Sequence, residues 1–250
     1  MRNFLFGFFL FLTVLIASCS PVLAHSPELT VEVAESLEAD LNLISLVSTE
    51  PASIVETVTP FPTLDSRSSV VITIDDGLVA EAFDQILQVL ASRGVHATFF
   101  LTANAVTRNL GSERMVALVL GGHEIAYHSV EHGEMEELAS WSAAEWEQDY
   151  QDWLAIMRTL LPEDLQDAIK PYARPPYGLK TLGFLDFCEK ENLSCWWWNA
   201  GPDTLNLNFP IRDGDIFIFH VRHSDLAAFE AFLARQSEFQ FLSLSEYLAE

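Results

Sequence analysis

Four short polar segments of this 250-residue chain carry side chains that are suited to hydrolytic chemistry. Three of them read TIDDG at 73–77, HSVEH at 128–132 and RPPYG at 174–178, and the fourth is His220, which ends the apolar run IFIFH. Each is set beside an apolar run, which places it at the end of an expected buried strand. Two adjacent carboxylates, paired histidines, an arginine and a further histidine are a sufficient set for a metal-assisted hydrolase.

The candidate metal ligands are Asp76, His128 and His132. Two neutral imidazoles and one carboxylate suit Zn²⁺ and similar divalent ions, and three protein ligands leave coordination positions for water and substrate. The two histidines are four residues apart, so one helical turn or a tight loop would place both on one side. The alternative is a solvated loop with incidental histidines, but the Asp-Asp pair after an earlier strand favours the metal site.

The adjacent carboxylates of Asp75 and Asp76 are expected to face different ways if the strand continues through them, because successive side chains on a strand alternate. One could then bind the metal while the other faces the attacking water as a base. The alternative is an ordinary Asp-Asp-Gly turn, since Asp and Gly both favour turns.

Apolar strand patterns alternate with helical patterns from residue 69 onwards. The expected strands are 69–75, 96–102, 123–129, 172–176, 193–199, 215–220 and 239–244. The expected helices are 79–94, 112–122, 141–161, 179–192, 226–236 and 245–250. This alternation predicts a parallel β/α architecture in a single domain.

The segments TIDDG, GHEIAYHSVEH, RPPYG and FIFH resemble, in this order, the motifs of the polysaccharide deacetylases, carbohydrate esterase family 4. The resemblance covers about residues 69–250. It implies a distorted (β/α) barrel of about seven parallel strands, in which polar residues at the carboxyl ends of strands form the active site.

The resemblance also implies a role for each polar residue. Asp75 matches the catalytic base, and Arg174 matches the arginine that pairs with the base and keeps it ionised. Tyr177 matches the residue whose backbone N–H helps to bind the oxyanion, and His220 matches the catalytic acid. The three candidate ligands match the metal triad. Without the family, Arg174 could be a surface arginine before a turn and His220 a satisfied core histidine.

The fourth motif of the family departs from its usual form, which is an Asp that supports the arginine, followed by Trp. Here the region reads WWWNAGPDTL, so Asp203 is the nearest equivalent, and a threonine follows it. Trp198 could supply an aromatic wall for the substrate, and Ile218 matches the apolar residue that lines the acetyl pocket. The alternative is that Trp196 and Trp198 share one face of a strand and pack in the core.

Residues 1–24 are typical of an export signal, with a basic start and an apolar stretch. Two cleavage sites compete: LIASC resembles a lipobox that would leave a lipidated Cys19, and VLA would release a secreted chain after Ala24. Residues 25–68, acidic and then rich in Pro, Ser and Thr, are expected to be a spacer, and 69–250 the catalytic domain.

The formal net charge of −23 and pI near 4.4 exclude nucleic acid as a natural partner, because phosphates need basic patches. The same charge argues against attraction to anionic lipid headgroups, so we expect membrane contact only through a lipid on Cys19. In an exported chain Cys188 and Cys195 could pair, and the sequence leaves that pairing open.

The sequence therefore predicts a metal-dependent extracytoplasmic hydrolase that removes N-acetyl or O-acetyl groups from a glycan. Zn²⁺ is the first choice of metal, with Co²⁺, Ni²⁺ or Mn²⁺ as alternatives. Two other functions stay open: hydrolysis of a small amide or another acyl substrate, and a catalytically inactive module that binds glycan. The identity of the glycan and the oligomeric state do not follow from the sequence.

Overall fold

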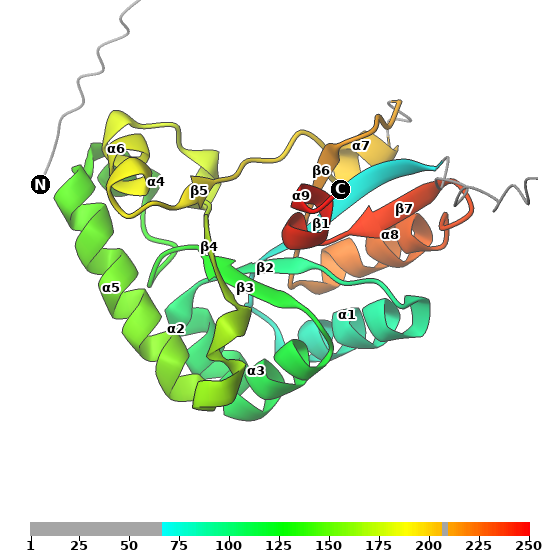
Figure 1. Cartoon of the computed structure of the whole chain (residues 1–250), viewed down its shortest axis with the longest axis horizontal. Coiled ribbons are helices and arrows are strands. Elements are labelled where there is room, and N and C mark those ends of the chain that lie inside the picture. Colours follow the sequence, from blue (N-terminus) through cyan, green and yellow to red (C-terminus); the bar gives the residue numbers. More distant parts are fainter. Residues whose placement is uncertain (1–66, 207–209) are drawn as a thin grey trace, which may run out of the picture. The chain divides into compact units, whose positions relative to one another are not determined.

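Seven strands form one sheet in the computed structural model, which describes residues 67–206 and 210–250 (Figure 1). The strands are β1 (Ser68–Asp76), β2 (Thr98–Leu101), β3 (Glu124–Tyr127), β4 (Ile169–Ala173), β5 (Ser194–Cys195), β6 (Asp215–His220) and β7 (Phe239–Leu242). They lie in the order β5-β4-β3-β2-β1-β6, and β7 also pairs with β1. All of these pairs are parallel, which confirms the predicted fold class.

Helical segments connect the strands and cover the outer face of the sheet. They are α1 (Ala80–Arg93), α2 (Ala103–Ala105), η1 (Val106–Leu110), α3 (Gly111–Leu120), α4 (Met135–Ser140), α5 (Ala143–Leu160), η2 (Glu163–Ala168), η3 (Pro176–Gly178), α6 (Leu182–Lys190), α7 (Pro202–Asn206), α8 (His223–Leu233) and α9 (Leu244–Leu248). Across the two described stretches, no helix combines the length and the hydropathy that a membrane crossing requires. The predictions for residues 1–24 and for Cys19 lie outside the described residues.

Side chains of β1 alternate between two apolar layers. Val70, Ile72 and Ile74 belong to the large core between sheet and helices. Val71 points the other way, into a smaller cluster inside the ring of strands, which consists of Val71, Phe100, Ala126, Tyr172 and Leu244. Asp75 shares the inner face with Val71, because alternate residues of a strand point the same way. The inner face of β1 therefore leads from the small core to the predicted catalytic base.

An irregular segment after β5 closes the ring of strands. The Asn199 and Ala200 N–H groups donate to the Ile216 carbonyl oxygen at 3.2 and 3.3 Å, and the Ile218 N–H donates to the Ala200 carbonyl oxygen at 3.0 Å. This isolated parallel bridge joins the segment to β6, so the barrel is distorted rather than regular.

The predicted strand at 193–199 is wrong in length, since β5 covers only Ser194–Cys195. The Trp196 N–H still donates to the Ala173 carbonyl oxygen at 2.8 Å. Beyond that point the neighbouring chain continues as Arg-Pro-Pro, and Pro175 and Pro176 have no N–H to extend a ladder. The tryptophan segment is therefore free to leave the sheet and turn towards β6.

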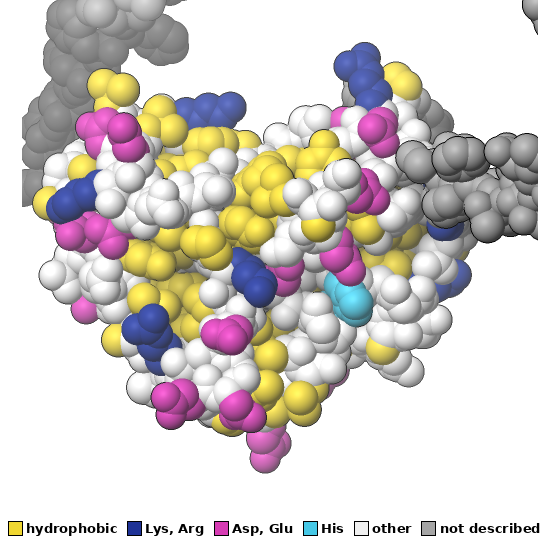
Figure 2. Space-filling view, viewed as in Figure 1, with side chains coloured by type: hydrophobic (Ala, Val, Ile, Leu, Met, Phe, Trp, Pro, Cys, Tyr) yellow, Lys and Arg dark blue, Asp and Glu magenta, His cyan; other side chains and the backbone are white. Residues whose placement is uncertain are grey.

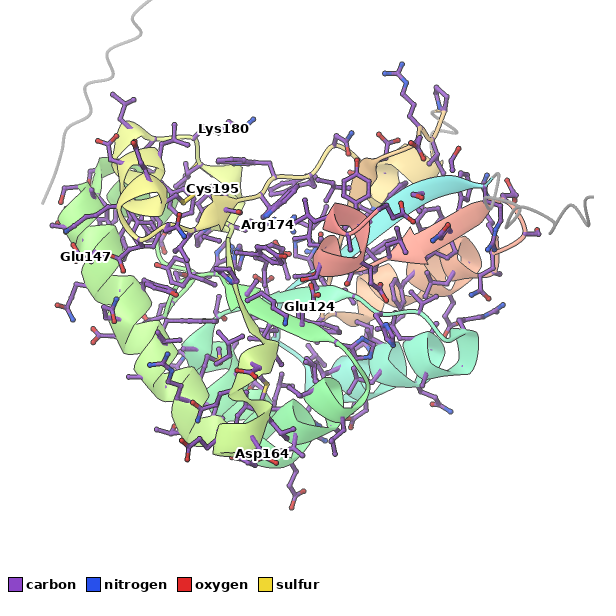
Figure 3. The ribbon with its side chains drawn as sticks, in the orientation of Figure 1. Glu124, Glu147, Asp164, Arg174, Lys180 and Cys195 are labelled. Atoms are coloured by element: carbon purple, nitrogen blue, oxygen red, sulfur yellow. A yellow bond between two sulfur atoms is a disulfide. The ribbon has the colours of Figure 1, made fainter. Side chains whose placement is uncertain are left out.

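A disulfide joins Cys188 of α6 to Cys195 of β5, with the two Cα atoms 6.3 Å apart (Cys195 is labelled in Figure 3). The sequence left this pairing open. The bond ties the end of a helix to the strand that leads into the tryptophan segment. It therefore anchors one end of the segment that closes the barrel.

We expect replacement of Cys188 and Cys195 by alanine to lower the free energy of unfolding by about 2 kcal/mol, because a short loop in the unfolded chain is no longer constrained. Urea unfolding of the oxidised protein, the reduced protein and the double variant measures this. Reduction should destabilise the wild type and leave the double variant unchanged. Equal stability of the oxidised and reduced wild type would contradict the prediction.

Candidate active site

The carboxyl ends of four strands bring most of the predicted site residues to one edge of the sheet. Asp75 and Asp76 end β1, and His220 ends β6 opposite Asp75 in the strand register. His128 follows β3 and Arg174 follows β4. Because parallel strands present their carboxyl ends at the same edge, residues far apart in the chain meet there.

Asp76, His128 and His132 lie together as the predicted metal triad. One ligand atom of each residue lies within 4.8 Å of the other two. Asp76 Oδ1 is 3.5 Å from His128 Nε2 and 3.9 Å from His132 Nε2. This oxygen is buried and accepts no hydrogen bond within the described part of the chain. A buried carboxylate oxygen that faces two imidazoles and accepts no hydrogen bond fits a divalent cation, because the cation would supply the missing partner.

The tautomer of His128 also suits a metal ligand. Its Nδ1 lies 2.8 Å from the carbonyl oxygen of Arg174. A carbonyl only accepts, so Nδ1 carries the hydrogen and Nε2 of the neutral ring keeps its lone pair. The Nε2 atom is the one that faces Asp76. This outer hydrogen bond thus fixes both the orientation and the ligand atom of the ring.

Asp75 and Asp76 lie on the same side of the site, contrary to strict strand alternation. Asp75 Oδ2 is 3.7 Å from His128 Nε2, close to the 3.5 Å of Asp76 Oδ1. The reason is the backbone at Asp76, whose φ of 79° is left-handed and breaks the pleat. Gly77 follows with φ 99°, a conformation that glycine adopts without strain.

The charges of the triad influence one another's protonation. Burial alone would raise the pKa of Asp76, but the facing imidazoles hold it below its ordinary value. Burial, together with His128, lowers the pKa of His132. Burial would also lower the pKa of His128, but the carboxylates of Asp75 and Asp76 raise it above the ordinary value. A cation bound here would compete with imidazole protons for the same carboxylate.

Asp75 is held by a buried ion pair with Arg174. One guanidinium nitrogen, NH1, donates to Asp75 Oδ1 at 2.7 Å and to Thr73 Oγ1 at 2.8 Å. The guanidinium carbon lies 4.1 Å from the centre of the Phe100 ring. Burial lowers the pKa of Arg174 and Asp75 opposes that shift, and an arginine stays charged in either case. The pair therefore orients the predicted base and supplies its counter-charge.

A carboxylate that the sequence analysis missed, Asp149 of α5, holds the loop between the two histidine ligands. Asp149 Oδ1 accepts the Val130 N–H at 3.0 Å and the Tyr127 hydroxyl at 2.5 Å. Asp149 lies three residues after Trp146 and four before Trp153, both fully buried. An acidic residue within the apolar stripe of a helix was the signal that could have identified it.

Tyr177 packs against His132, the second predicted histidine ligand. Its backbone is left-handed, with φ 59°, and its ring centre lies 4.4 Å from that of His132. The Tyr177 hydroxyl donates to the carbonyl oxygen of Gly133 at 2.8 Å. The structure thus brings Tyr177 next to the metal triad, and its predicted role as a backbone donor to an oxyanion stays a prediction.

A cleft of about 600 Å³ lies beside His220. Its lining includes Ile218 and Trp198, the two predicted substrate contacts, and also Asp203. A second pocket of about 370 Å³ is lined in part by His132 and Tyr177. The metal triad and the predicted acid therefore each border an open space large enough for part of a substrate.

Trp198 is 37% exposed, so the alternative that it packs in the core beside Trp196 is wrong for Trp198. Its ring lies 5.5 Å from the guanidinium carbon of Arg174. The ring also closes over Gly178, where an added Cβ would meet it at 2.8 Å, so only a glycine fits there. Trp196 packs against the small inner cluster, as the alternative predicted.

The structure does not pair Asp203 with Arg174, the group that it was expected to support. Asp203 is exposed on α7. Arg174 pairs with Asp75, and His220 Nδ1 lies 3.2 Å from Oδ2 of a different residue, Asp225. Asp225 is buried on α8 and lies outside all four sequence motifs, so motif reading had no signal for it.

Comparisons with known proteins agree with this fold. The family model described as "Polysaccharide deacetylase" matches residues 64–192. A chitooligosaccharide deacetylase of Bradyrhizobium sp. (strain ANU 289) is 29% identical over 134 residues, which are 54% of this chain and 57% of that protein. The chain thus spans little more than half the length of this curated relative.

Two solved structures illustrate the likeness in fold. Peptidoglycan deacetylase PdaC from Bacillus subtilis has a TM-score of 0.59 at 20% identity, covering 72% of this chain and 90% of that one. BA3943 from Bacillus anthracis, described as a pseudoenzyme of carbohydrate esterase family 4, has a TM-score of 0.60 at 18% identity, covering 72% and 65%. At such identities the likeness establishes the fold alone.

The partly buried position of Asp149 raises its pKa to about 6, with neighbouring acids adding to the effect. The native protein therefore keeps the Asp149 carboxyl protonated at pH values where this carboxyl is already ionised in the unfolded chain. The stability that this proton contributes is complete below about pH 4 and is lost as the pH rises through about 6. In metal-free protein, the stability of the wild type relative to Asp149→Asn should fall by about 2 kcal/mol between pH 4.5 and 7.

Urea unfolding at several pH values measures this difference. Asp186→Asn, at an exposed carboxylate on α6, is the control and should run parallel to the wild type. A wild type and Asp149→Asn whose stabilities change in parallel with pH would refute the prediction.

Proposed function

The chain belongs to the polysaccharide deacetylase family, and from this membership and the geometry of the site we propose that it is a metal-dependent hydrolase that removes acetyl groups from a glycan outside the cytoplasm. One observation carries the proposal. The Asp76–His128–His132 cluster lies beside an ion-paired Asp75, and His220 lies opposite Asp75 on the neighbouring strand.

Asp76, His128 and His132 would hold one divalent ion, for which Zn²⁺ fits the ligand set and Co²⁺, Ni²⁺ or Mn²⁺ are alternatives. Such an ion, when bound, polarises an acyl oxygen and lowers the pKa of water at its open position. The protein supplies ligand orientation through the hydrogen bond between His128 Nδ1 and the Arg174 carbonyl oxygen.

Asp75 accepts the proton of the water that attacks the acyl carbon, and Arg174 keeps its carboxylate aimed and compensated in charge. The Tyr177 backbone N–H donates to the oxyanion that develops on the acyl oxygen. His220 then protonates the leaving amine or alcohol. The two proton-transfer groups are register partners on neighbouring strands, so both lie at the same edge of the sheet.

An acetylated glycan suits the surroundings of this site. The partly exposed Trp198 ring offers a flat apolar surface in the cleft, on which a sugar ring can stack. The net charge of −23 disfavours polyanions. On the face drawn in Figure 2, acidic side chains are spread among apolar and basic ones rather than gathered in one patch. The relative named chitooligosaccharide deacetylase supports the same substrate class.

An inactive glycan-binding module is the second candidate, and one observation favours it. Asp203, the equivalent of a fourth-motif residue, is exposed, and Arg174 pairs with Asp75 instead. A family member of similar fold is described as a pseudoenzyme. The other predicted site residues lie together at the carboxyl ends of the strands, and this arrangement favours catalysis.

The disulfide between Cys188 and Cys195 supports an extracytoplasmic location, because such bonds persist in oxidising compartments. The apolar stretch within residues 1–24 supports export. The protein is then either anchored by a lipid on Cys19 or secreted after cleavage behind Ala24.

We expect the full chain, purified in detergent, to release acetate from at least one member of a panel of chitin oligomers, peptidoglycan, acetylated xylan and small acetamides. Chelation should abolish release, and Zn²⁺ or Co²⁺ should restore it. Asp75→Asn should lower the rate by at least about 100-fold, because general base catalysis is worth that much, while keeping its bound metal. Asp186→Asn, an exposed carboxylate, is the matched control.

Release that survives chelation would contradict the metal dependence. Acetate release from small acetamides alone would show that the substrate is a small amide and not a glycan. Glycan binding without release, by protein shown to contain metal, would establish the inactive module.

Mass spectrometry of the protein after expression in a bacterium tests the location. A diacylated or triacylated N-terminus at Cys19 is the expected result, and an unmodified start at His25 would identify the secreted form. An intact N-terminus on cytoplasmic protein would refute export.

A further inference from the structure

The predicted acid, His220, is held by a helix that carries none of the sequence motifs. We propose that Asp225, at the third position of α8, is the positioning residue of His220 and fixes the orientation and tautomer of its ring. The proposal rests on the proposed function, because it concerns the proton that the leaving group receives.

Asp225 Oδ2 is shared by two groups of the same histidine. It accepts the His220 backbone N–H at 3.0 Å, and it lies 3.2 Å from His220 Nδ1. An ionised carboxylate only accepts, so the hydrogen of the contact is on Nδ1. Nε2 is then the ring nitrogen left to face the cleft that His220 lines. Two contacts to one residue hold its ring and its backbone together.

The other oxygen of Asp225 is occupied as well. Oδ1 accepts the Arg222 Nε–H at 2.8 Å and the Ser224 hydroxyl at 3.0 Å. Burial would raise the pKa of this carboxyl, but the contacts with His220, Arg222 and Ser224 hold it well below the ordinary value. The carboxylate is therefore ionised at neutral pH and cannot rotate away without breaking several hydrogen bonds.

The local backbone explains why an acid belongs at this position. α8 begins at His223, so Asp225 lies in its first turn, where the helix dipole favours a negative charge. The chain turns sharply between strand and helix, with the Arg222 N–H donating to the His220 carbonyl oxygen at 2.8 Å. This turn brings the third helical residue back over the end of β6.

The same turn is tied to the strand of the predicted base. The Val221 N–H donates to the carbonyl oxygen of Asp75 at 3.2 Å. The position of the acid is thus set by two anchors, the backbone of β1 on one side and the carboxylate of Asp225 on the other. Of these, Asp225 alone contacts the imidazole ring.

The experiment compares two substrates whose leaving groups differ in their need for a proton. One is the acetylated glycan that the wild type turns over, and the other is 4-nitrophenyl acetate, whose phenolate departs without an acid. Asp225→Asn should lower kcat on the glycan by about 100-fold, with KM changed less than about twofold. On the ester, its rate should stay within about threefold of the wild type.

Glu145→Gln is the matched control. Glu145 is also the third residue of a helix, α5, and its carboxylate accepts the Ser142 backbone N–H at 2.7 Å. This variant reports the cost of losing a carboxylate at a helix start without touching His220. It should leave both rates unchanged.

A double-mutant cycle separates positioning from a general structural role. In a His220→Ala background, Asp225→Asn should cost less than about twofold on the glycan, because the residue through which it acts is gone. Equal losses on both substrates, or the same 100-fold loss without His220, would overturn the proposal.

Nitrogen NMR of the wild-type histidines tests the tautomer without any need for Asp225→Asn to fold. The His220 signals, identified by their loss in His220→Ala, should show a protonated Nδ1 and an unprotonated Nε2 in the neutral ring. The opposite tautomer would overturn the proposal. A wild type that releases no acetate would refute the proposed function instead, and the NMR result would still decide the role of Asp225.

Discussion

The buried ion pair between Asp75 and Arg174 is the interaction on which the rest of the site depends. Arg174 is 0% exposed, so the loss of either charge would leave the other uncompensated in the barrel interior. Arg174 also donates to Thr73 Oγ1 at 2.8 Å and, from Nε, to the Trp196 carbonyl oxygen at 3.3 Å. Its own carbonyl oxygen lies 2.8 Å from His128 Nδ1. One residue therefore orients the predicted base, sets the tautomer of a predicted metal ligand and contacts the segment that closes the barrel.

Two helices outside the ring of strands each use a carboxylate to hold a segment that carries predicted site residues. Asp149 of α5 accepts the Val130 N–H in the loop between the two predicted histidine ligands, and Asp225 of α8 accepts the His220 N–H. Each carboxylate satisfies a backbone donor that a tight loop would otherwise leave unpaired. The loops are thereby fixed against rigid elements, so the site is organised before any substrate arrives.

The strand order divides the site into two sides. The predicted metal ligands come from β1 and the loop after β3, whereas the predicted acid comes from β6 on the other edge of β1. Each side borders its own pocket, one beside Tyr177 and one beside Trp198. The Trp198 side exists because the chain leaves the sheet after β5, where the disulfide of Cys195 anchors it. The closure of the barrel and the shape of the substrate site are therefore one feature.

Some of this was determined by the sequence alone. Apolar runs predicted the parallel strands, and the polar residues that follow such strands lie at one edge of any parallel sheet. Asp76, His128 and His132 could therefore be identified as candidate metal ligands from residue type and spacing. The tertiary structure decided what depends on single dihedral angles or on contacts between distant segments. A left-handed Asp76 put two adjacent carboxylates on one side, and prolines in the neighbouring chain cut β5 short and freed Trp198. The partner of His220 was decided in the same way, because a tight turn, and no motif, carries the carboxylate of α8 back to the ring.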